Sequence, residues 1–412
     1  MVSVEEASRI ILRQVSPLPG EEVALLQAAG RVLFENVRAS RNVPPFANSA
    51  MDGYAVRWLD VARASATDPV TLSVLEDVPA GYVARRRVTK GNATRIMTGA
   101  PVPRGADAIV RVEYTEFIGD RVRISRVDGQ GSHIRGIGED IQKGRPILKK
   151  GKLLTSADIG LLASVGKSRV RVYRRPTVAI ISTGDELLEV DDSPQPGKIV
   201  NSNSYTLSAA VQEIGAVPHL LGIVRDKRKS LALAFKRALH YDVVITSGGV
   251  SVGDYDLVKG ALLDVGVRMA LWRVAQRPGH PFAFGRMGSK PVFGLPGNPV
   301  SSAVSFLLYA RPALLKMMGH KSFFLPVIHA TLEHEIKKTK GLKEFIRCCL
   351  REDDGRSFAS STGTQSSGVL HSLSLAQGLI VCKEEETLLP KGSQVPVILL
   401  RHQGLLSGEL GF

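Results

Sequence analysis

Between residues 174 and 320, three short apolar runs are each followed by a loop rich in glycine, hydroxyl or proline residues. The runs are 177–181, 243–246 and 292–293, and segments with helical spacing lie between and after them. Buried parallel strands have continuous apolar sequences, because helices cover both faces of their sheet. The alternation predicts a doubly wound α/β domain, in which loops leaving the carboxyl ends of the strands meet at one edge and bind ligands.

The three loops carry groups that suit anion binding. We expect substrate-binding roles for Ser182, Thr183, Gly184, Ser247, Gly248, Gly249, Pro296, Gly297 and Asn298. Glycines let the backbone approach a phosphate closely, and Asn298 could cap a helix starting at Pro299, leaving backbone N–H groups for an anion. Glycine and proline could also simply turn the chain. Three such loops in register favour a binding site.

Four carboxylates lie on these loops or follow a neighbouring apolar run. Glu186 could take part in chemistry or meet the positive end of a helix dipole, and Asp226 could serve a site or cap the next helix. Asp254 and Asp256 alternate as metal ligands would, although turn carboxylates are common on glycine loops. Because such oxygens suit Mg²⁺ bridged to phosphates, we predict Mg²⁺ as the cofactor, held by Asp226, Asp254 and Asp256.

Three cationic candidates, Arg273, Arg277 and His280, lie close together in the sequence. Pro278 and Pro281 exclude a helix through this segment and stiffen it. We therefore predict that the three side chains are presented on a preset loop, where they bind an oxyanion or a phosphate.

Composition narrows the classes of partner. The formal net charge is +15, but Lys and Arg are scattered with little aromatic interleaving, so we expect no nucleic-acid partner. No apolar run approaches the roughly 18 residues of a membrane span, and residues 1–13 do not resemble a signal peptide. We therefore expect a cytoplasmic protein with no membrane partner.

The three cysteines, Cys348, Cys349 and Cys382, form no metal-binding spacing with one another or with histidine. We expect them to pack in a core. Any soft metal handled by this chain would then be held by something other than protein thiolates.

Periodicity and chain breakers organise the remaining sequence, and a chain of 412 residues should form three or four domains. Helical spacing predicts helices at 3–15, 21–29, 153–165, 203–214 and 229–240. Short alternating runs predict strands at 70–75, 109–114, 121–124, 326–332, 345–351 and 394–400.

Seven motifs, in order along nearly the whole chain, resemble those of the molybdopterin molybdenumtransferases, the family that includes the C-terminal domain of gephyrin. They are NSAMDGYAV (48–56), RIMTGAPVP (95–103), GEDI (138–141), STGDEL (182–187), SGGVSVG (247–253), PGHPFAFG (278–285) and GLPGNPV (294–300).

The resemblance implies a multidomain α/β protein. We expect an elongated, discontinuous helical domain at 1–42 and 141–173 that serves as linker and dimerisation domain. An inserted β-rich domain at 43–140, a doubly wound molybdopterin-binding α/β domain at 174–320 and a β-barrel-like C-terminal domain at 321–412 complete the prediction.

The resemblance also implies a reaction: molybdenum from molybdate, or tungsten from tungstate, is inserted into adenylylated molybdopterin with Mg²⁺-dependent release of AMP. It assigns catalytic roles to Asp52, Thr98, Asp140, Glu186 and Asp226, and pterin-side binding to Ser366 and Ser367. In that family the β-rich domain of one subunit faces the α/β domain of the other, so we expect a homodimer with shared active sites.

Two features leave alternatives open. The family usually has lysines where this chain has Arg277 and His280, and apparently Arg273, while Asp52 and Thr98 each begin a dipeptide that also suits a plain turn. Two other functions compete. A molybdopterin adenylyltransferase shares the α/β domain, but the additional domains argue against it. A non-enzymatic scaffold like gephyrin needs no carboxylate and cation set, so that set favours an enzyme.

Overall fold

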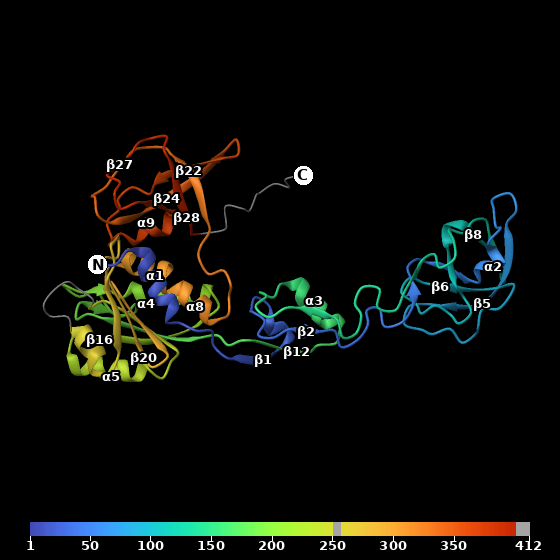
Figure 1. Cartoon of the computed structure of the whole chain (residues 1–412), viewed down its shortest axis with the longest axis horizontal. Coiled ribbons are helices and arrows are strands. Elements are labelled where there is room, and N and C mark those ends of the chain that lie inside the picture. The colour runs from blue at the N-terminus through green and yellow to red at the C-terminus, as the bar shows by residue number, and fades with distance from the viewer. Residues whose placement is uncertain (250–256, 401–412) are drawn as a thin grey trace. The chain divides into compact units, whose positions relative to one another are not determined.

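The computed structural model describes residues 1–249 and 257–400. The chain divides into two compact units, Met1–Glu21 with Val172–Phe412 and Glu22–Arg171 (Figure 1). The described residues contain no helix that is both long enough and apolar enough to cross a membrane.

A six-stranded sheet forms the centre of the first unit, in the order β16-β13-β17-β21-β20-β18. Its strands are β16 (Val217–Val224), β13 (Thr177–Thr183), β17 (Val243–Ser247), β21 (Lys290–Leu295), β20 (Pro281–Met287) and β18 (Arg268–Arg273). The first four are parallel, and β20 and β18 are antiparallel to their neighbours. The apolar runs of the sequence thus become neighbouring strands, as predicted.

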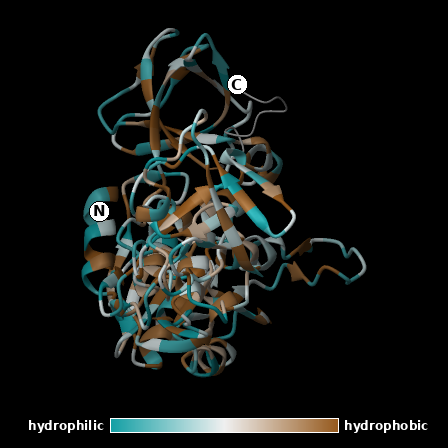
Figure 2. Cartoon of the chain, turned by 90° about the vertical axis from the view of Figure 1, so that its right-hand side faces the viewer, coloured by the Kyte–Doolittle hydropathy of each residue, from teal (hydrophilic) through white to brown (hydrophobic). Residues whose placement is uncertain are grey.

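Helices cover both faces of this sheet. Successive residues of β13 point to opposite faces, so they pack in two different cores. Val178 and Ile180 pack with α4 (Ser202–Glu213) and α7 (Pro299–Ser305), while Ala179 and Ile181 pack with α5 (Arg228–Ala238) and α6 (Leu257–Asp264). The first core also contains residues of α1 (Val4–Arg13) and α8 (Arg311–Met317). Figure 2 shows hydrophobic and hydrophilic colour alternating along α1, beside the N-terminus, as expected for a helix with one face in a core. The predicted doubly wound arrangement is confirmed.

The C-terminal part of the same unit is a closed barrel. Its strands are β24 (Lys343–Asp353), β25 (Arg356–Ser361), β22 (Val327–Leu332), β28 (Gln394–Leu399) and β26 (Gly378–Cys382), and the pairing of β24 with β26 closes the ring. Cys348 and Cys382 lie in its core, where burial raises the pKa of both thiols to about 12. They remain protonated near neutral pH, which fits core packing and not metal binding.

The second unit contains a sheet in the order β7-β4-β6-β5-β9-β8. The strands are β7 (Ala108–Arg111), β4 (Gly53–Val56), β6 (Asn92–Ile96), β5 (Val70–Val78), β9 (Arg121–Ile124) and β8 (Thr115–Ile118). The helix α3 (Ser156–Ser164) is also in this unit, and Thr155 and Asp158 cap its start reciprocally.

Two sequence predictions are wrong in detail. Residues 21–29 do not form a helix, since β1 (Gly20–Ala24) pairs with β12 (Arg169–Tyr173) and only the short 3₁₀ turn η1 (Leu25–Ala28) follows. Pairing with a distant strand satisfies the backbone there and overrides local spacing. The strand predicted at 109–114 ends at Arg111, because the next residues form the 3₁₀ turn η2 (Val112–Tyr114).

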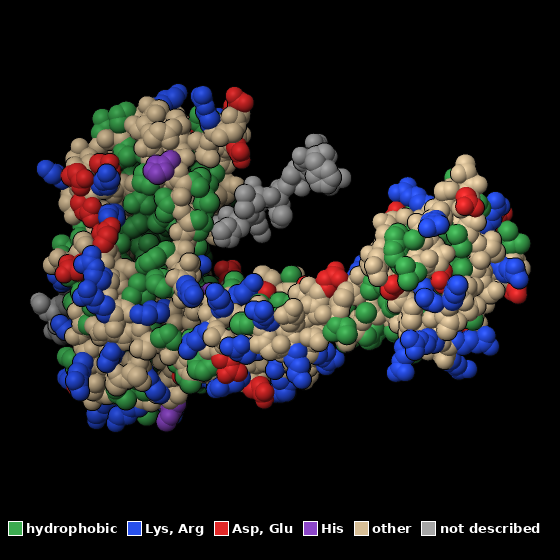
Figure 3. Space-filling view, turned by 45° about the vertical axis from the view of Figure 1, so that its right-hand side comes forward, with side chains coloured by type: hydrophobic (Ala, Val, Ile, Leu, Met, Phe, Trp, Pro, Cys, Tyr) green, Lys and Arg blue, Asp and Glu red, His purple; other side chains and the backbone are tan. Residues whose placement is uncertain are grey.

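Basic side chains are spread over the visible surface of each unit (Figure 3). Several lie in surface ion pairs, including Arg95 with Asp77 and Arg228 with Asp264. Some of the basic side chains are thus paired on the surface, as expected for a solvated exterior.

Candidate functional site

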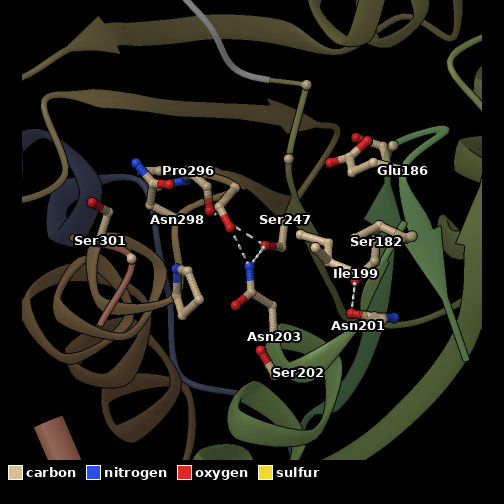
Figure 4. A pocket seen from close by; sticks show the side chains of 18 of the residues that line it. Ser182, Glu186, Ile199, Asn201, Ser202, Asn203, Ser247, Pro296, Asn298 and Ser301 are labelled. Carbon is tan, nitrogen blue, oxygen red and sulfur yellow. Dashed lines mark hydrogen bonds between the residues drawn. The ribbon is translucent and has the colours of Figure 1, made fainter. Parts of the chain in front are cut away.

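A cavity of about 520 Å³ lies at the carboxyl ends of β13, β17 and β21 (Figure 4). The lining residues come mainly from the loops after these strands, from the start of α4 and from the start of α7. They are Ser182, Thr183, Gly184, Glu186, Leu187, Ile199, Val200, Asn201, Ser202, Asn203, Asp226, Ser247, Gly248, Gly249, Pro281, Pro296, Gly297, Asn298, Pro299, Ser301 and Gly368. The three loops singled out in the sequence therefore converge on one pocket.

Gly248 lets two of these loops approach each other closely. Its φ of +94° lies in the left-handed region, and a Cβ atom there would sit 2.3 Å from the carbonyl oxygen of Thr183. Any side chain at this position would push the β13 and β17 loops apart. The glycine is required by the geometry of the pocket wall.

A hydrogen-bond network joins the pocket to α4. Ser182 Oγ donates to Asn201 Oδ1 at 2.9 Å and lies 2.8 Å from Ser204 Oγ. Asn203 Nδ2 donates to Ser247 Oγ at 2.7 Å and to the carbonyl oxygen of Gly297 at 2.7 Å. These bonds tie the ends of all three strands to one helix.

Asn201, Ser202 and Asn203 also line the pocket, although they are not among the site residues predicted from the sequence. Asn201 is the N-cap of α4 and accepts a hydrogen bond from the backbone N–H of Ser204. The run of Asn and Ser before an apolar helix is a signal for this arrangement. The helix was predicted to begin only at Asn203, which hid the preceding residues.

Glu186 lies in a turn and not in the first turn of a helix, because the next helix begins only at Ser202. Of its two possible roles, contact with a helix dipole is therefore excluded, and its side chain lines the pocket. Asp226 does not cap a helix either, since the N-cap of α5 is Lys227 and has no side-chain cap.

Asp226 is instead a partly buried carboxylate on the pocket wall, close to other negative charges. Burial, and after it the negative charges of Asp185 and Glu186, raise the pKa of Asp226. Its Oδ1 is buried and has no hydrogen-bond partner among the described residues. A carboxylate in this setting favours a proton or a cation beside it.

The predicted metal ligands Asp254 and Asp256 lie outside the described residues. Within the described ranges, no three His, Cys, Asp or Glu side chains are placed to hold a metal ion together. Asp226 is thus the one predicted ligand whose surroundings the structure shows.

The segment that carries the three predicted cations, residues 273–280, comes directly before the pocket residue Pro281 in the chain but does not line the pocket. Arg277 Nη1 is 3.8 Å from Glu344 Oε1, and His280 Nδ1 is 3.0 Å from the carbonyl oxygen of Val274. As predicted, no helix passes through this segment. The predicted single loop is wrong for Arg273 and Arg277, because they lie in the strands β18 and β19 (Gln276–Arg277), and only His280 lies between strands. Pro281 lines the pocket, whereas Arg273, Arg277 and His280 do not.

The C-terminal barrel contributes to the pocket through its hydroxyl-rich loop. Asn298 is the N-cap of α7 with Pro299 in the first turn, as predicted, but its side chain does not cap. Asn298 Nδ2 donates instead to Ser367 Oγ at 3.0 Å, and the carbonyl oxygen of Ser367 accepts from the N–H of Val300 at 3.1 Å. The carbonyl oxygen of Ser366 accepts a hydrogen bond from Arg347. Ser366 and Ser367 are thus brought to the pocket's edge.

The second unit brings Asp52 and Thr98 together. Asp52 Oδ1 accepts from the N–H and the hydroxyl of Thr98, each at 2.7 Å, and these bonds lower the pKa of Asp52. Asp140 lies in the same unit, where its N–H donates to the carbonyl oxygen of Val43. Asp52 remains an ionised acceptor near neutral pH.

Comparison with known proteins identifies the family. A molybdopterin molybdenumtransferase from Nostoc sp. is 38% identical over 410 residues, which cover 97% of this chain and 94% of that protein. This chain belongs to the molybdopterin molybdenumtransferase family. The Mycobacterium tuberculosis protein named molybdopterin molybdenumtransferase 2 is 39% identical, covering 96% of this chain and 99% of its own.

Solved structures and family models agree with this membership. Two crystal structures of the molybdopterin biosynthesis MoeA protein from Pyrococcus horikoshii match with TM-scores of 0.84 and 0.80 and identities of 32% and 31%; each match covers 97% of this chain, with 99% and 100% of those chains. Family models match residues 2–166 (MoeA N-terminal region, domains I and II), 179–316 (probable molybdopterin binding domain) and 329–400 (MoeA C-terminal region, domain IV).

In this molybdenumtransferase family member, the pocket falls almost entirely within one matched region. Every lining residue except Gly368 lies in the probable molybdopterin binding domain, and Gly368 lies in the MoeA C-terminal region. The pocket found by geometry and the region identified by sequence comparison therefore coincide.

Proposed function

We propose that this member of the molybdopterin molybdenumtransferase family acts in molybdenum cofactor biosynthesis. It would insert molybdenum from molybdate into adenylylated molybdopterin and release AMP. The observation that carries the proposal is the pocket at the ends of β13, β17 and β21, because its lining lies within the matched molybdopterin binding domain. The names of relatives that match nearly the full chain support the same activity.

Uncharged polar groups of the pocket would bind and orient the substrate. Ser182 and Asn298 offer hydroxyl and amide groups, Ser247 would act through the 296–298 loop, and Gly248 and Gly297 let backbone approach a phosphate. Fixed donors of this kind position a reacting group without reorganising during the reaction. The pocket therefore suits a phosphorylated organic substrate.

Mg²⁺ is the proposed cofactor, and the surroundings of Asp226 fit it. The raised pKa and unpartnered Oδ1 of Asp226 indicate a carboxylate that lacks a positive neighbour. Magnesium sites in such enzymes commonly use one or two carboxylates together with substrate phosphates. Asp226 would hold the ion with Asp254 and Asp256, and the bound ion would neutralise phosphate charge.

The reaction requires cleavage of the phosphoanhydride and exchange of oxide for sulfur on molybdenum. Water adds its oxygen to phosphorus as the P–O bond breaks, and AMP leaves. Each oxide that leaves molybdenum takes up protons and departs as water, while a dithiolene sulfur of the substrate replaces it and the metal's oxidation state stays the same. The S–H groups of the substrate's dithiol supply protons as their sulfurs bind the metal, and the carboxylate of Glu186, which lines the pocket, would relay protons to the departing oxide. Asp226 would act through the ion that it holds.

Three further elements complete the proposal. Arg273, Arg277 and His280 would bind the incoming oxyanion, and tungstate would serve as well as molybdate because both carry the same charge. Asp52, Thr98 and Asp140 would complete the site from the second subunit of a homodimer.

The test is to incubate purified protein with adenylylated molybdopterin, Mg²⁺ and molybdate and to follow AMP by chromatography. AMP release that depends on the oxyanion supports the proposal. ATP-dependent adenylylation of molybdopterin would indicate the adenylyltransferase instead. Substrate binding without any turnover would leave only a scaffold.

A further inference from the structure

Asn203 occupies a central position in the pocket wall although it lies on α4, outside the three strand loops. Its side-chain amide donates to Ser247 Oγ and to the carbonyl oxygen of Gly297, each at 2.7 Å (Figure 4). Ser247 Oγ in turn donates to the carbonyl oxygen of Pro296 at 3.3 Å. One amide thus holds the loop after β21 at two successive carbonyl groups, directly and through Ser247.

The direction of these bonds follows from the chemistry of the groups. The carbonyl oxygen of Gly297 can only accept, so the NH₂ group of Asn203 must face it. The Ser247 hydroxyl accepts from the same NH₂ group, which leaves its proton for the carbonyl oxygen of Pro296. Asn203 Oδ1 is buried and has no partner among the described residues, so it does not compete for these contacts.

Fixing the two carbonyl groups also fixes the N–H groups on the other side of their peptide planes. In a trans peptide, C=O and N–H point in opposite directions. The N–H groups of Gly297 and Asn298 therefore point away from Asn203 and Ser247. Within residues 1–249 and 257–400, neither N–H group donates a hydrogen bond to the protein.

We propose that Asn203 is a positioning residue of the substrate pocket. Its amide holds Ser247 and the 296–298 loop in the orientation in which the N–H groups of Gly297 and Asn298 bind an oxygen atom of the substrate's phosphates. The inference rests on the proposed function, because it takes adenylylated molybdopterin as the ligand of this pocket. Asn203 acts through the loop and does not itself contact the substrate.

Substrate binding without turnover tests this role. The dissociation constant of adenylylated molybdopterin is measured by calorimetry with Mg²⁺ and without molybdate, beside steady-state KM and kcat. For Asn203→Ala we expect a dissociation constant and a KM raised roughly tenfold or more, with a much smaller change in kcat at saturation.

Four companion variants make the test specific. Asn203→Asp keeps the shape and the Oδ1 acceptor but loses both donated bonds, so it should bind as poorly as Asn203→Ala. Ser247→Ala should weaken binding, and the double variant with Asn203→Ala should bind no worse than Asn203→Ala alone, because the two side chains act in one chain of bonds. Thr206→Val is the matched control: it removes a hydrogen bond within α4, from Thr206 Oγ1 to the carbonyl oxygen of Ser202, and should bind normally.

The outcomes separate the two proposals. If wild-type protein binds the substrate but releases no AMP, the proposed function fails while the binding series still decides the role of Asn203. A folded Asn203→Ala variant that binds like wild type overturns the inference. Normal binding by Asn203→Asp also overturns it, since the acceptor and not the donor would then matter. Absence of binding by the wild-type protein overturns both.

Discussion

Replacing Arg347 by methionine should damage the pocket while leaving the fold nearly as stable. Arg347 lies on β24 and is fully buried, without a carboxylate bonded to it among the described residues. Nε donates to Ser372 Oγ at 2.7 Å, and Nη2 donates to the carbonyl oxygens of Thr364 and Ser366 at 3.0 and 3.1 Å. These bonds hold the loop that carries Ser367 and the pocket residue Gly368.

Two opposing effects set how much Arg347→Met changes the free energy of unfolding: the loss of hydrogen bonds and the relief of a buried charge. Burial lowers the pKa of Arg347, which shows that the guanidinium pays for desolvation, and Nη1 has no partner among the described residues. The bonds from a charged donor are worth about 1.5–3 kcal/mol each, whereas burying an ion costs several kcal/mol. Thr364 and Ser366 are exposed, so their carbonyl groups can turn to water. Arg347→Met should therefore change the free energy of unfolding by less than about 2 kcal/mol.

Arg347→Ala provides the comparison, since it also leaves a cavity in the barrel and should cost about 2–5 kcal/mol. Chemical denaturation measures both unfolding free energies, and hydrogen exchange of peptides spanning 362–368 measures the loop. We expect faster exchange of this loop and a higher KM in Arg347→Met. Unchanged exchange and KM in that variant, or a loss of stability as large as in Arg347→Ala, would refute the reasoning.

Three other predictions follow from charged groups. The folded protein raises the pKa of Asp226 above its ordinary value of 3.8, so ionisation of Asp226 opposes folding as pH rises. Asp226→Asn should therefore raise the melting temperature of the metal-free protein at pH 7.5 but not below pH 3.8, and it should abolish AMP release. An unchanged melting temperature at pH 7.5 would contradict the raised pKa. Burial raises the pKa of Asp242, but hydrogen bonds from Arg174 outweigh it and lower that pKa. Asp242→Asn should therefore destabilise the protein at neutral pH, and the difference in stability from wild type should shrink as pH falls below 3.8. A difference in stability that does not depend on pH would count against this explanation. Mixed Asp52→Ala and Glu186→Ala subunits should regain partial activity, unless sites are not shared between subunits.

The sequence predicted the arrangement of the α/β domain because its signals are local. Continuous apolar runs at β13, β17 and β21 define strands that are buried on both faces, and the glycine loops after them must then lie at one edge. The prediction failed where distant pairing decided the outcome. Residues 20–24 form a strand only because residues 169–173 lie beside them, and no local pattern encodes that pairing.

The sequence likewise predicted some residues of the candidate site and missed others. Loop residues such as Ser247 and Gly297 were found because they follow strand ends, and motif resemblance supplied Asp52 and Thr98 in the other unit. Asn203 was missed because its role depends on its reach across to two loops from a helix. A single asparagine at a helix start carries no sequence signal for that reach.

Charge explains why this pocket needs help from outside its own lining. Among the described residues that line it, Glu186 and Asp226 are the only ones with ionisable side chains, yet the proposed substrates are anions. Two like unit charges about 5 Å apart repel by about 3 kcal/mol at an effective dielectric constant near 20. Neutral donors such as the backbone N–H groups of Gly297 and Asn298 would offset only part of this repulsion. Burial, and after it the charges of Asp185 and Glu186, raise the pKa of Asp226 before any substrate arrives. Under the proposed function, a divalent ion held at Asp226 would supply the missing positive charge and relieve the repulsion among the carboxylates.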